Sequence, residues 1–168
     1  MEFIGTLYRA LNPLWAREPL SGEGAAQFGG RFNARGTPAL YTSLRPETAM
    51  REANQAGAFQ PITLVAYAAE IEKVFNATDT GALASIGFDA AMLADPCWRD
   101  TMLTDKISGT QRLARSLIEQ GFSGMLAPSY APQATAEDRN LVLWSWGTSL
   151  PAKLRLIDDQ GRLGYLPS

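Results

Sequence analysis

Residues 22–43, GEGAAQFGGRFNARGTPALYTS, decide how the first half of this chain folds. Five glycines stand in this stretch, all before residue 37, and few bulky side chains separate them. This density predicts an ordered loop or a broken strand over residues 17–37 rather than a helix. The run PALYTS that follows, residues 38–43, predicts a β-strand with Tyr41 near its C-terminal end.

The sequence on either side predicts further strands and helices. A strand over residues 6–11 is ended by Asn12-Pro13, because proline donates no hydrogen bond to a sheet. A helix over residues 46–57 begins with Pro46 in its first turn and ends at Gly57. Later patterns predict a long strand over 62–74, short helices and turns over 78–104, a helix over 108–120 followed by a left-handed cap at Gly121, strands over 124–127, 140–146 and 153–157, and a hairpin strand over 162–166.

The order of these elements indicates the fold class. Several strands separate the helices without a regular strand–helix alternation, which favours an α+β fold with a mainly antiparallel sheet. The glycine run does not open a helix directly after a strand, and no Gly-Lys-Ser/Thr follows it, so it is neither a Rossmann nor a Walker fingerprint. The length of 168 residues, 46% of them hydrophobic, suits one core, and we expect a single domain over residues 1–168.

Composition narrows the chemistry. The chain has no histidine, which excludes Ser-His and Cys-His catalytic pairs and zinc sites with histidine ligands. Its net charge of −2 gives no general attraction for nucleic acids. The single cysteine, Cys97, has no partner for an internal disulfide, and no secretion signal or membrane-spanning run is visible. We therefore expect a cytoplasmic protein, and nothing in the sequence calls for a metal.

Three residues in and just after the opening stretch suit a dinucleotide such as NAD. Arg31 follows two glycines and could grip phosphate oxygens, although an arginine that ties a loop to a carbonyl would look the same. Tyr41 could stack on a ring and donate from its hydroxyl, or could simply pack. Glu52 falls on a helix stripe of small residues, where its carboxylate could stabilise the positive charge that develops when an N-glycosidic bond breaks. A solvated glutamate is the alternative reading of Glu52.

Two further residues stay ambiguous. Ser129, in the turn-like run APSYA, could bind a ribose or a phosphate, or could satisfy its own turn. Arg9 could be a second phosphate ligand or an ordinary ion-pair partner at the end of a strand. Trp144 and Trp146, on one face of a predicted strand, suggest core or partner surface rather than catalysis.

Taken together, these pieces resemble the RES-domain family, the toxin components of bacterial toxin–antitoxin pairs. The resemblance is carried in order by YR at residues 8–9, GEGAAQFGGRFN at 22–33, GTPALYTS at 36–43, the helix that bears Glu52, GFSGMLAPS at 121–129 and NLVLW at 140–144. The family usually shows tryptophan where Phe32 stands, and this change keeps an aromatic side chain. The residues beyond Trp146 are not diagnostic.

The resemblance implies a fold like that of the ADP-ribosyltransferases and an enzyme that consumes NAD. It implies that Glu52 and Arg31 are catalytic and that Arg9, Arg31, Tyr41 and Ser129 bind NAD. It also implies a cognate antitoxin in a hetero-oligomer, encoded beside the toxin and able to cover the cleft; we expect that partner to bind DNA. The acceptor of ADP-ribose stays open between a protein, slightly favoured, water and phosphate. A non-catalytic nucleotide-binding module and an RNA-cleaving toxin are the other hypotheses, the last disfavoured because the chain is acidic and lacks histidine.

Overall fold

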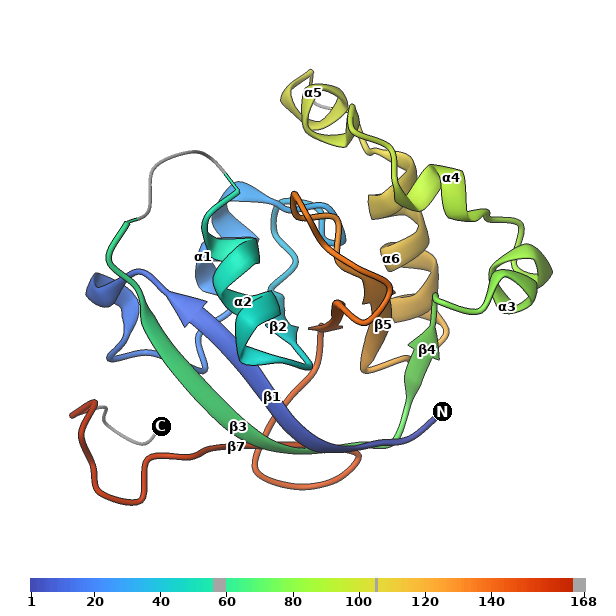
Figure 1. Ribbon diagram of the computed structural model, residues 1–168. Helices are drawn as coiled ribbons and strands as arrows, with labels where there is room; N and C mark the ends of the chain where they lie inside the picture. Colours follow the sequence, from blue (N-terminus) through green and yellow to red (C-terminus); the bar gives the residue numbers. More distant parts are fainter. Residues whose placement is uncertain (56–59, 105, 165–168) are drawn as a thin grey trace.

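One curled sheet of seven strands forms the centre of the molecule (Figure 1). The computed structural model describes residues 1–55, 60–104 and 106–164. The strand order in the sheet is β4-β5-β6-β2-β1-β3-β7. Five of the six pairings between described strands are antiparallel, and β4 pairs with β5 in parallel. The strands are β1 (Phe3–Leu11), β2 (Leu40–Ser43), β3 (Thr63–Ile71), β4 (Val74–Asn76), β5 (Gly124–Pro128), β6 (Arg139–Leu143) and β7 (Ala152–Leu156). The predicted α+β class with a mainly antiparallel sheet is confirmed.

Helices flank this sheet in two groups. In Figure 1 α1 and α2 lie near β1 and β2, whereas α6 lies beside β5 with α3, α4 and α5 beyond it. The α-helices are α1 (Glu23–Phe28), α2 (Pro46–Ala53), α3 (Thr80–Ser85), α4 (Ala90–Leu93), α5 (Trp98–Leu103) and α6 (Gly109–Glu119), and a 3-10 helix covers Pro13–Trp15. None of the helices in the described ranges has both the length and the apolar character needed to cross a bilayer.

The buried apolar side chains form two clusters. The first joins β1, β3, β6 and β7 and includes Leu7, Tyr67 and Leu154. The second lies between β5 and the helices α3, α4 and α6, and it includes Leu113 and Met125. Alternation along a strand points successive side chains to opposite faces, which is how β6 contributes Leu141 and Leu143 to one cluster and Val142 to the other. The candidate site lies where these two clusters meet.

Most predicted elements are present with shifted ends. The helix over 108–120 is α6, with a capping box between Ser108 and Gln111 and with Gly121 at φ +80°. The predicted long strand over 62–74 is two strands, β3 and β4. The predicted strand over 153–157 is β7, one residue earlier. Of the predicted hairpin over 162–166, the described residues 162–164 form turns and no strand, and the rest lies outside the described residues.

The glycine-rich stretch departs most from the prediction. Residues 23–28 form α1, where a loop or broken strand is expected. Hydrogen bonds from the residues that follow hold this short helix. The Asn33 side-chain amide donates to the carbonyl of Ala25 at 2.8 Å, and the backbone N–H of Gly36 donates to the carbonyl of Ala26 at 2.8 Å. Gly29, at φ +72°, ends the helix. A short helix that depends on individual hydrogen bonds from residues eight and ten positions further on has no signature in local composition.

Three other predictions around the site are corrected in detail. Tyr41 is the second residue of β2 rather than near its C-terminal end. The helix that bears Glu52 ends at Ala53, and the predicted end at Gly57 lies outside the described residues. The predicted strand over 140–146 ends at Leu143, so the two tryptophans leave the strand and do not share a face. Trp144 packs in the second cluster and donates to the carbonyl of Phe32, whereas Trp146 packs against the first.

Candidate active site

The Glu52 carboxylate lies at the centre of the candidate site, in the last turn of α2. Its Oε1 accepts hydrogen bonds from the Ser129 hydroxyl at 2.6 Å and from the Asn140 side-chain amide at 2.5 Å. Its Oε2 accepts from the side-chain amide of Gln55, an exposed residue just beyond the helix. Two donors from separate segments therefore fix one carboxylate oxygen, while the other is bonded to a group that lies in solvent. A solvated glutamate, the alternative reading, is not what the structure shows.

Asp138 ties α2 to the segment before β6. Its carboxylate accepts from the Thr48 hydroxyl at 2.5 Å and from the Arg51 guanidinium at 2.7 Å, both on α2, and from the backbone and hydroxyl of Thr135. The residue is only 2% exposed. The backbone N–H of Thr135, followed by the Thr48 hydroxyl, holds the pKa of Asp138 well below its usual range. The backbone carbonyl of Asp138 also accepts from the N–H of Ser129, so the same residue places a donor of Glu52.

Tyr41 uses its hydroxyl within the protein. The hydroxyl donates to Asn33 Oδ1 at 2.7 Å and accepts from the backbone N–H of Phe32 at 2.9 Å. Burial raises the pKa of Tyr41, so the hydroxyl stays protonated. Gly30 is required next to it, because a Cβ there would lie against the tyrosine hydroxyl and 2.6 Å from Asn33 Oδ1. The expected hydroxyl donor for a ligand is thus already engaged, and the absence of a Cβ at Gly30 makes room for Tyr41.

Arg31 both ties a loop and faces a cavity. Its Nη1 donates to the carbonyls of Leu93 at 2.9 Å and Asp95 at 3.0 Å, which is the structural role that the sequence left open. Its guanidinium carbon lies 4.7 Å from the ring centroid of Tyr130 and 5.5 Å from that of Trp98. Burial lowers the pKa of Arg31 from its usual value. The aromatic contacts hold the guanidinium plane against two rings.

Arg9 fixes the chain that follows the 3-10 helix. Its Nη1 donates to the carbonyls of Pro19 and Ser21, each at 3.2 Å. The Tyr67 hydroxyl donates to the same carbonyl of Pro19 from β3. This arginine therefore joins β1 to the segment that leads into α1, and it stays half-buried.

Two cavities open on either side of Glu52. We call them the first lobe, about 580 Å³, and the second lobe, about 570 Å³. Both are lined by the residues Gly29, Tyr41, Glu52, Ala53 and Asn140, so they adjoin along this shared wall. Arg9 lines the first lobe and Arg31 the second. The described residues bring no three His, Cys, Asp or Glu side chains into a metal-binding group.

The structure brings most of the predicted site residues together. Arg31, Tyr41 and Glu52 line the second lobe, and Arg9 shares the first lobe with Tyr41 and Glu52. Ser129 lines neither lobe and instead lies behind Glu52, to which it donates. Binding of NAD by these residues stays a prediction.

Sequence reasoning missed several members of the site. Asn140 and Tyr130 stand inside motifs quoted above, NLVLW and APSYA, and a search for polar or aromatic residues at motif edges could have found them. Gln55, Trp98 and Arg99, which also line the second lobe, carry no sequence signal that separates them from surface residues.

Comparison with known proteins places this fold. The family model for the RES domain matches residues 6–165. Among solved structures, a chain from the crystal structure of the MbcT–MbcA toxin–antitoxin complex of M. tuberculosis is similar, with a TM-score of 0.64, 24% sequence identity, and coverage of 94% of this chain and 84% of that chain. No curated protein matches the sequence. At this identity the solved structure shows a shared fold alone, whereas the family model covers nearly every residue, and the chain belongs to the RES domain family.

Proposed function

We propose that the protein is the toxin of a bacterial toxin–antitoxin pair, an enzyme that cleaves the bond between nicotinamide and ribose in NAD and transfers ADP-ribose to an acceptor. The observation that carries the proposal is the shared cavity: Arg31, Tyr41 and Glu52 line one lobe, and Glu52 is fixed by two donors. An anion-binding guanidinium, an aromatic ring and an oriented carboxylate are the groups that a dinucleotide glycosyl transfer needs.

Glu52 acts on the ribose next to nicotinamide. As the C1′–N bond breaks, nicotinamide leaves with the bonding electron pair and positive charge develops on the ribose ring. Oε1 is already occupied by Ser129 and Asn140, so Oε2 accepts the ribose hydroxyl once the exposed Gln55 side chain moves away. The nucleophile then bonds to C1′ and loses its proton. A carboxylate aligned before reaction stabilises the developing charge without reorganisation.

The other predicted site residues, except Ser129, keep their predicted roles in this proposal. Arg31 binds the phosphates through the part of its guanidinium that does not hold the two carbonyls. Tyr41 offers its ring at the junction of the lobes. Ser129 contributes by holding Glu52 rather than by lining either lobe. Arg9 as a second phosphate ligand stays a prediction.

The first test is release of nicotinamide from NAD by the purified protein. Arg31→Ala and Glu52→Gln are each expected to abolish release, because the first removes phosphate binding and the second removes the negative charge at the ribose. Glu119→Gln, on the exposed face of α6, is the matched control and should release nicotinamide at the wild-type rate. Full turnover by either site variant would overturn the mechanism. Saturable NAD binding without any nicotinamide release over hours would instead identify a nucleotide-binding module.

The acceptor is tested separately. A protein acceptor, which the open cleft slightly favours, predicts a mass increase of one ADP-ribose on a protein incubated with toxin and NAD. Free ADP-ribose in solution would identify a glycohydrolase, and its phosphorylated form in phosphate buffer would identify a phosphorylase.

The antitoxin is proposed from the family and from the surface around the first lobe. Trp15 is 61% exposed and Phe28 is 64% exposed, and both line that lobe. Exposed aromatic side chains around a cleft are typical of surfaces that a partner covers. The solved structure with a similar fold comes from a toxin–antitoxin complex. Co-expression with the product of the adjacent gene should relieve toxicity, and co-purification should block nicotinamide release.

A further inference from the structure

The two lobes of the cleft carry opposite charges. Apart from Glu52, which they share, the first lobe is lined by Arg9 and two glutamates, Glu18 and Glu23. The second lobe is lined by Arg31 and Arg99 and by no acidic residue of its own. A ligand that is positive at one end and negative at the other would therefore bind in one direction.

The second lobe holds its two arginines against one indole. The guanidinium carbon of Arg99 lies 5.0 Å from the ring centroid of Trp98, and that of Arg31 lies 5.5 Å from it. Like charges near one ring repel each other, and an anion bound in the lobe that both arginines line relieves that repulsion. The Asp95 carboxylate acts on Arg31 but does not line the lobe. Two guanidinium groups that line one lobe suit a pyrophosphate, which carries two negative charges.

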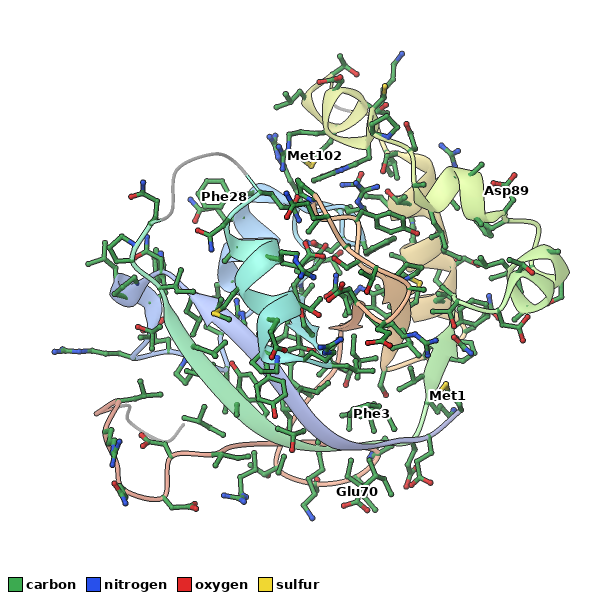
Figure 2. All side chains as sticks on the ribbon, in the orientation of Figure 1. Met1, Phe3, Phe28, Glu70, Asp89 and Met102 are labelled. Atoms are coloured by element: carbon green, nitrogen blue, oxygen red, sulfur yellow. The ribbon has the colours of Figure 1, made fainter. Side chains whose placement is uncertain are left out.

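The first lobe combines acidic and aromatic side chains. Glu18 and Glu23 are exposed and form no ion pair within the described residues. The rings of Trp15 and Phe28 line the same lobe, and Figure 2 shows Phe28 at the edge of the molecule near α1. Carboxylates beside exposed rings suit a flat cation, because both the negative charge and the ring faces attract it.

We propose that this charge separation fixes the direction in which NAD lies in the cleft. The pyrophosphate binds in the second lobe between Arg31 and Arg99, the ribose lies at Glu52, and the cationic nicotinamide ring enters the first lobe toward Glu18 and Glu23. Arg99 is then a specificity residue for the ADP half, and Arg9, which lines the first lobe, orders the segment before α1. The inference rests on the proposed function and adds the orientation of its substrate.

This orientation also gives an order of product release. Cleavage leaves the electron pair of the C1′–N bond on nicotinamide, which becomes neutral and loses its attraction to the glutamates of the first lobe. ADP-ribose keeps both phosphates and stays with the arginines of the second lobe. The acceptor bonds to C1′ and loses its proton as the C1′–N bond breaks, and nicotinamide therefore leaves before the ADP-ribosyl product.

NADH tests the pyrophosphate site and the nicotinamide site separately, because it carries the same pyrophosphate with a neutral nicotinamide ring. Dissociation constants for NAD, NADH and ADP-ribose are measured by calorimetry in the Glu52→Gln background, so that NAD is not consumed. The test variants are Arg99→Gln and the double variant Glu18→Gln, Glu23→Gln. Arg115→Gln and Glu119→Gln, an exposed pair on α6 outside both lobes, are the charge-matched controls.

Arg99→Gln should weaken all three ligands by the same factor, about fivefold for a partly solvated charge contact. The double glutamate variant should weaken NAD by about the same factor and leave NADH and ADP-ribose unchanged. The orientation is wrong if Arg99→Gln behaves like Arg115→Gln, or if the glutamate variant weakens NADH as much as NAD. Failure of the wild-type protein to bind or cleave NAD would instead overturn the proposed function, and the orientation with it.

Discussion

At the scale of single residues, the carboxylate of Glu52 is defined by its donors. Ser129 and Asn140 lie 77 and 88 positions away in the chain, and both donate to Oε1. The Asn140 amide is itself held, because its Oδ1 accepts from the Ser43 hydroxyl at 2.7 Å. Hydrogen bonds to a charged group are stronger than neutral ones, so this pair of donors determines where the free oxygen points.

Asn140→Ala is expected to lower kcat for nicotinamide release about tenfold, since a hydrogen bond to a charged group contributes about 1.5 kcal/mol. The dissociation constant for ADP-ribose in the Glu52→Gln background should change little, because the loss concerns the ribose end of NAD rather than the phosphates. Gln120→Ala, an exposed amide after α6, is the control for removal of a side-chain amide. Equal losses of kcat and ligand affinity would mean that Asn140 supports the fold and does not orient Glu52.

At the scale of elements, the position of α2 depends on one buried carboxylate. Asp138 bonds Thr48 and Arg51 on the helix and Thr135 in the preceding segment. Because its folded-state pKa lies below the unfolded value, the stability it contributes is complete above the ordinary aspartate pKa of about 4. That contribution is lost as the pH falls through the lower pKa of the folded state.

Asp138→Asn should therefore destabilise the protein at neutral pH, and the difference from wild type should shrink as the pH falls below about 4. Urea unfolding at a series of pH values measures this difference. Nicotinamide release should also fall, because α2 carries Glu52. The exposed Glu137→Gln, whose carboxylate pairs with Arg45, serves as the control and should show neither effect. A destabilisation that is constant down to pH 2 would contradict the assignment.

The contact between Gly30, in the glycine-rich stretch, and Tyr41 of β2 gives a second prediction at this scale. Gly30→Ala should destabilise the protein by about 1–3 kcal/mol, because its Cβ would meet the Tyr41 hydroxyl and Asn33 Oδ1. Gly24→Ala is a matched control, since a Cβ at this position in α1 would meet nothing within 4 Å. It should leave stability unchanged or raise it by up to about 1 kcal/mol, because alanine favours helix. Thermal and urea unfolding compare the two variants.

At the scale of the whole molecule, the cleft lies where the two buried clusters meet. β6, which contributes Asn140 to the cleft, supplies buried residues to both clusters. Its neighbour β2 supplies Leu40 to the first cluster and packs Tyr41, a cleft residue, against the second. A ligand that binds there contacts both halves of the molecule, and it stabilises the folded state by mass action.

ADP-ribose at a hundred times its dissociation constant should stabilise the protein by about 2.7 kcal/mol, which raises Tm by about 5–10 °C for a chain of this length. Differential scanning fluorimetry measures the shift. Arg31→Ala should lose it, whereas Arg115→Gln should keep it. A wild-type Tm that does not respond to saturating ADP-ribose would mean that the cleft does not hold this half of NAD.

The sequence by itself determined most of the helices and strands and which catalytic groups are available. Pro46 marks the start of α2, and Gly121, with its positive φ, follows the end of α6. Both signals are visible in the sequence because they act within a few residues. Alternation and residue order predicted the α+β class, and the ordered motifs predicted the family. Arg31, Tyr41 and Glu52 were recognisable because each stands in a local pattern.

Only the tertiary structure decided how these residues are used. The Tyr41 hydroxyl donates to Asn33, and the Arg31 guanidinium donates to two backbone carbonyls. Asn140 and Arg99 line the cleft. The tertiary structure also forms α1 from a glycine-rich stretch through contacts to Asn33. The contacts of Arg31 and Asn140 join segments far apart in the chain, whereas those of Tyr41 and α1 come from the Asn33 side chain within the same stretch. Individual hydrogen bonds of either kind leave no periodicity or composition to read.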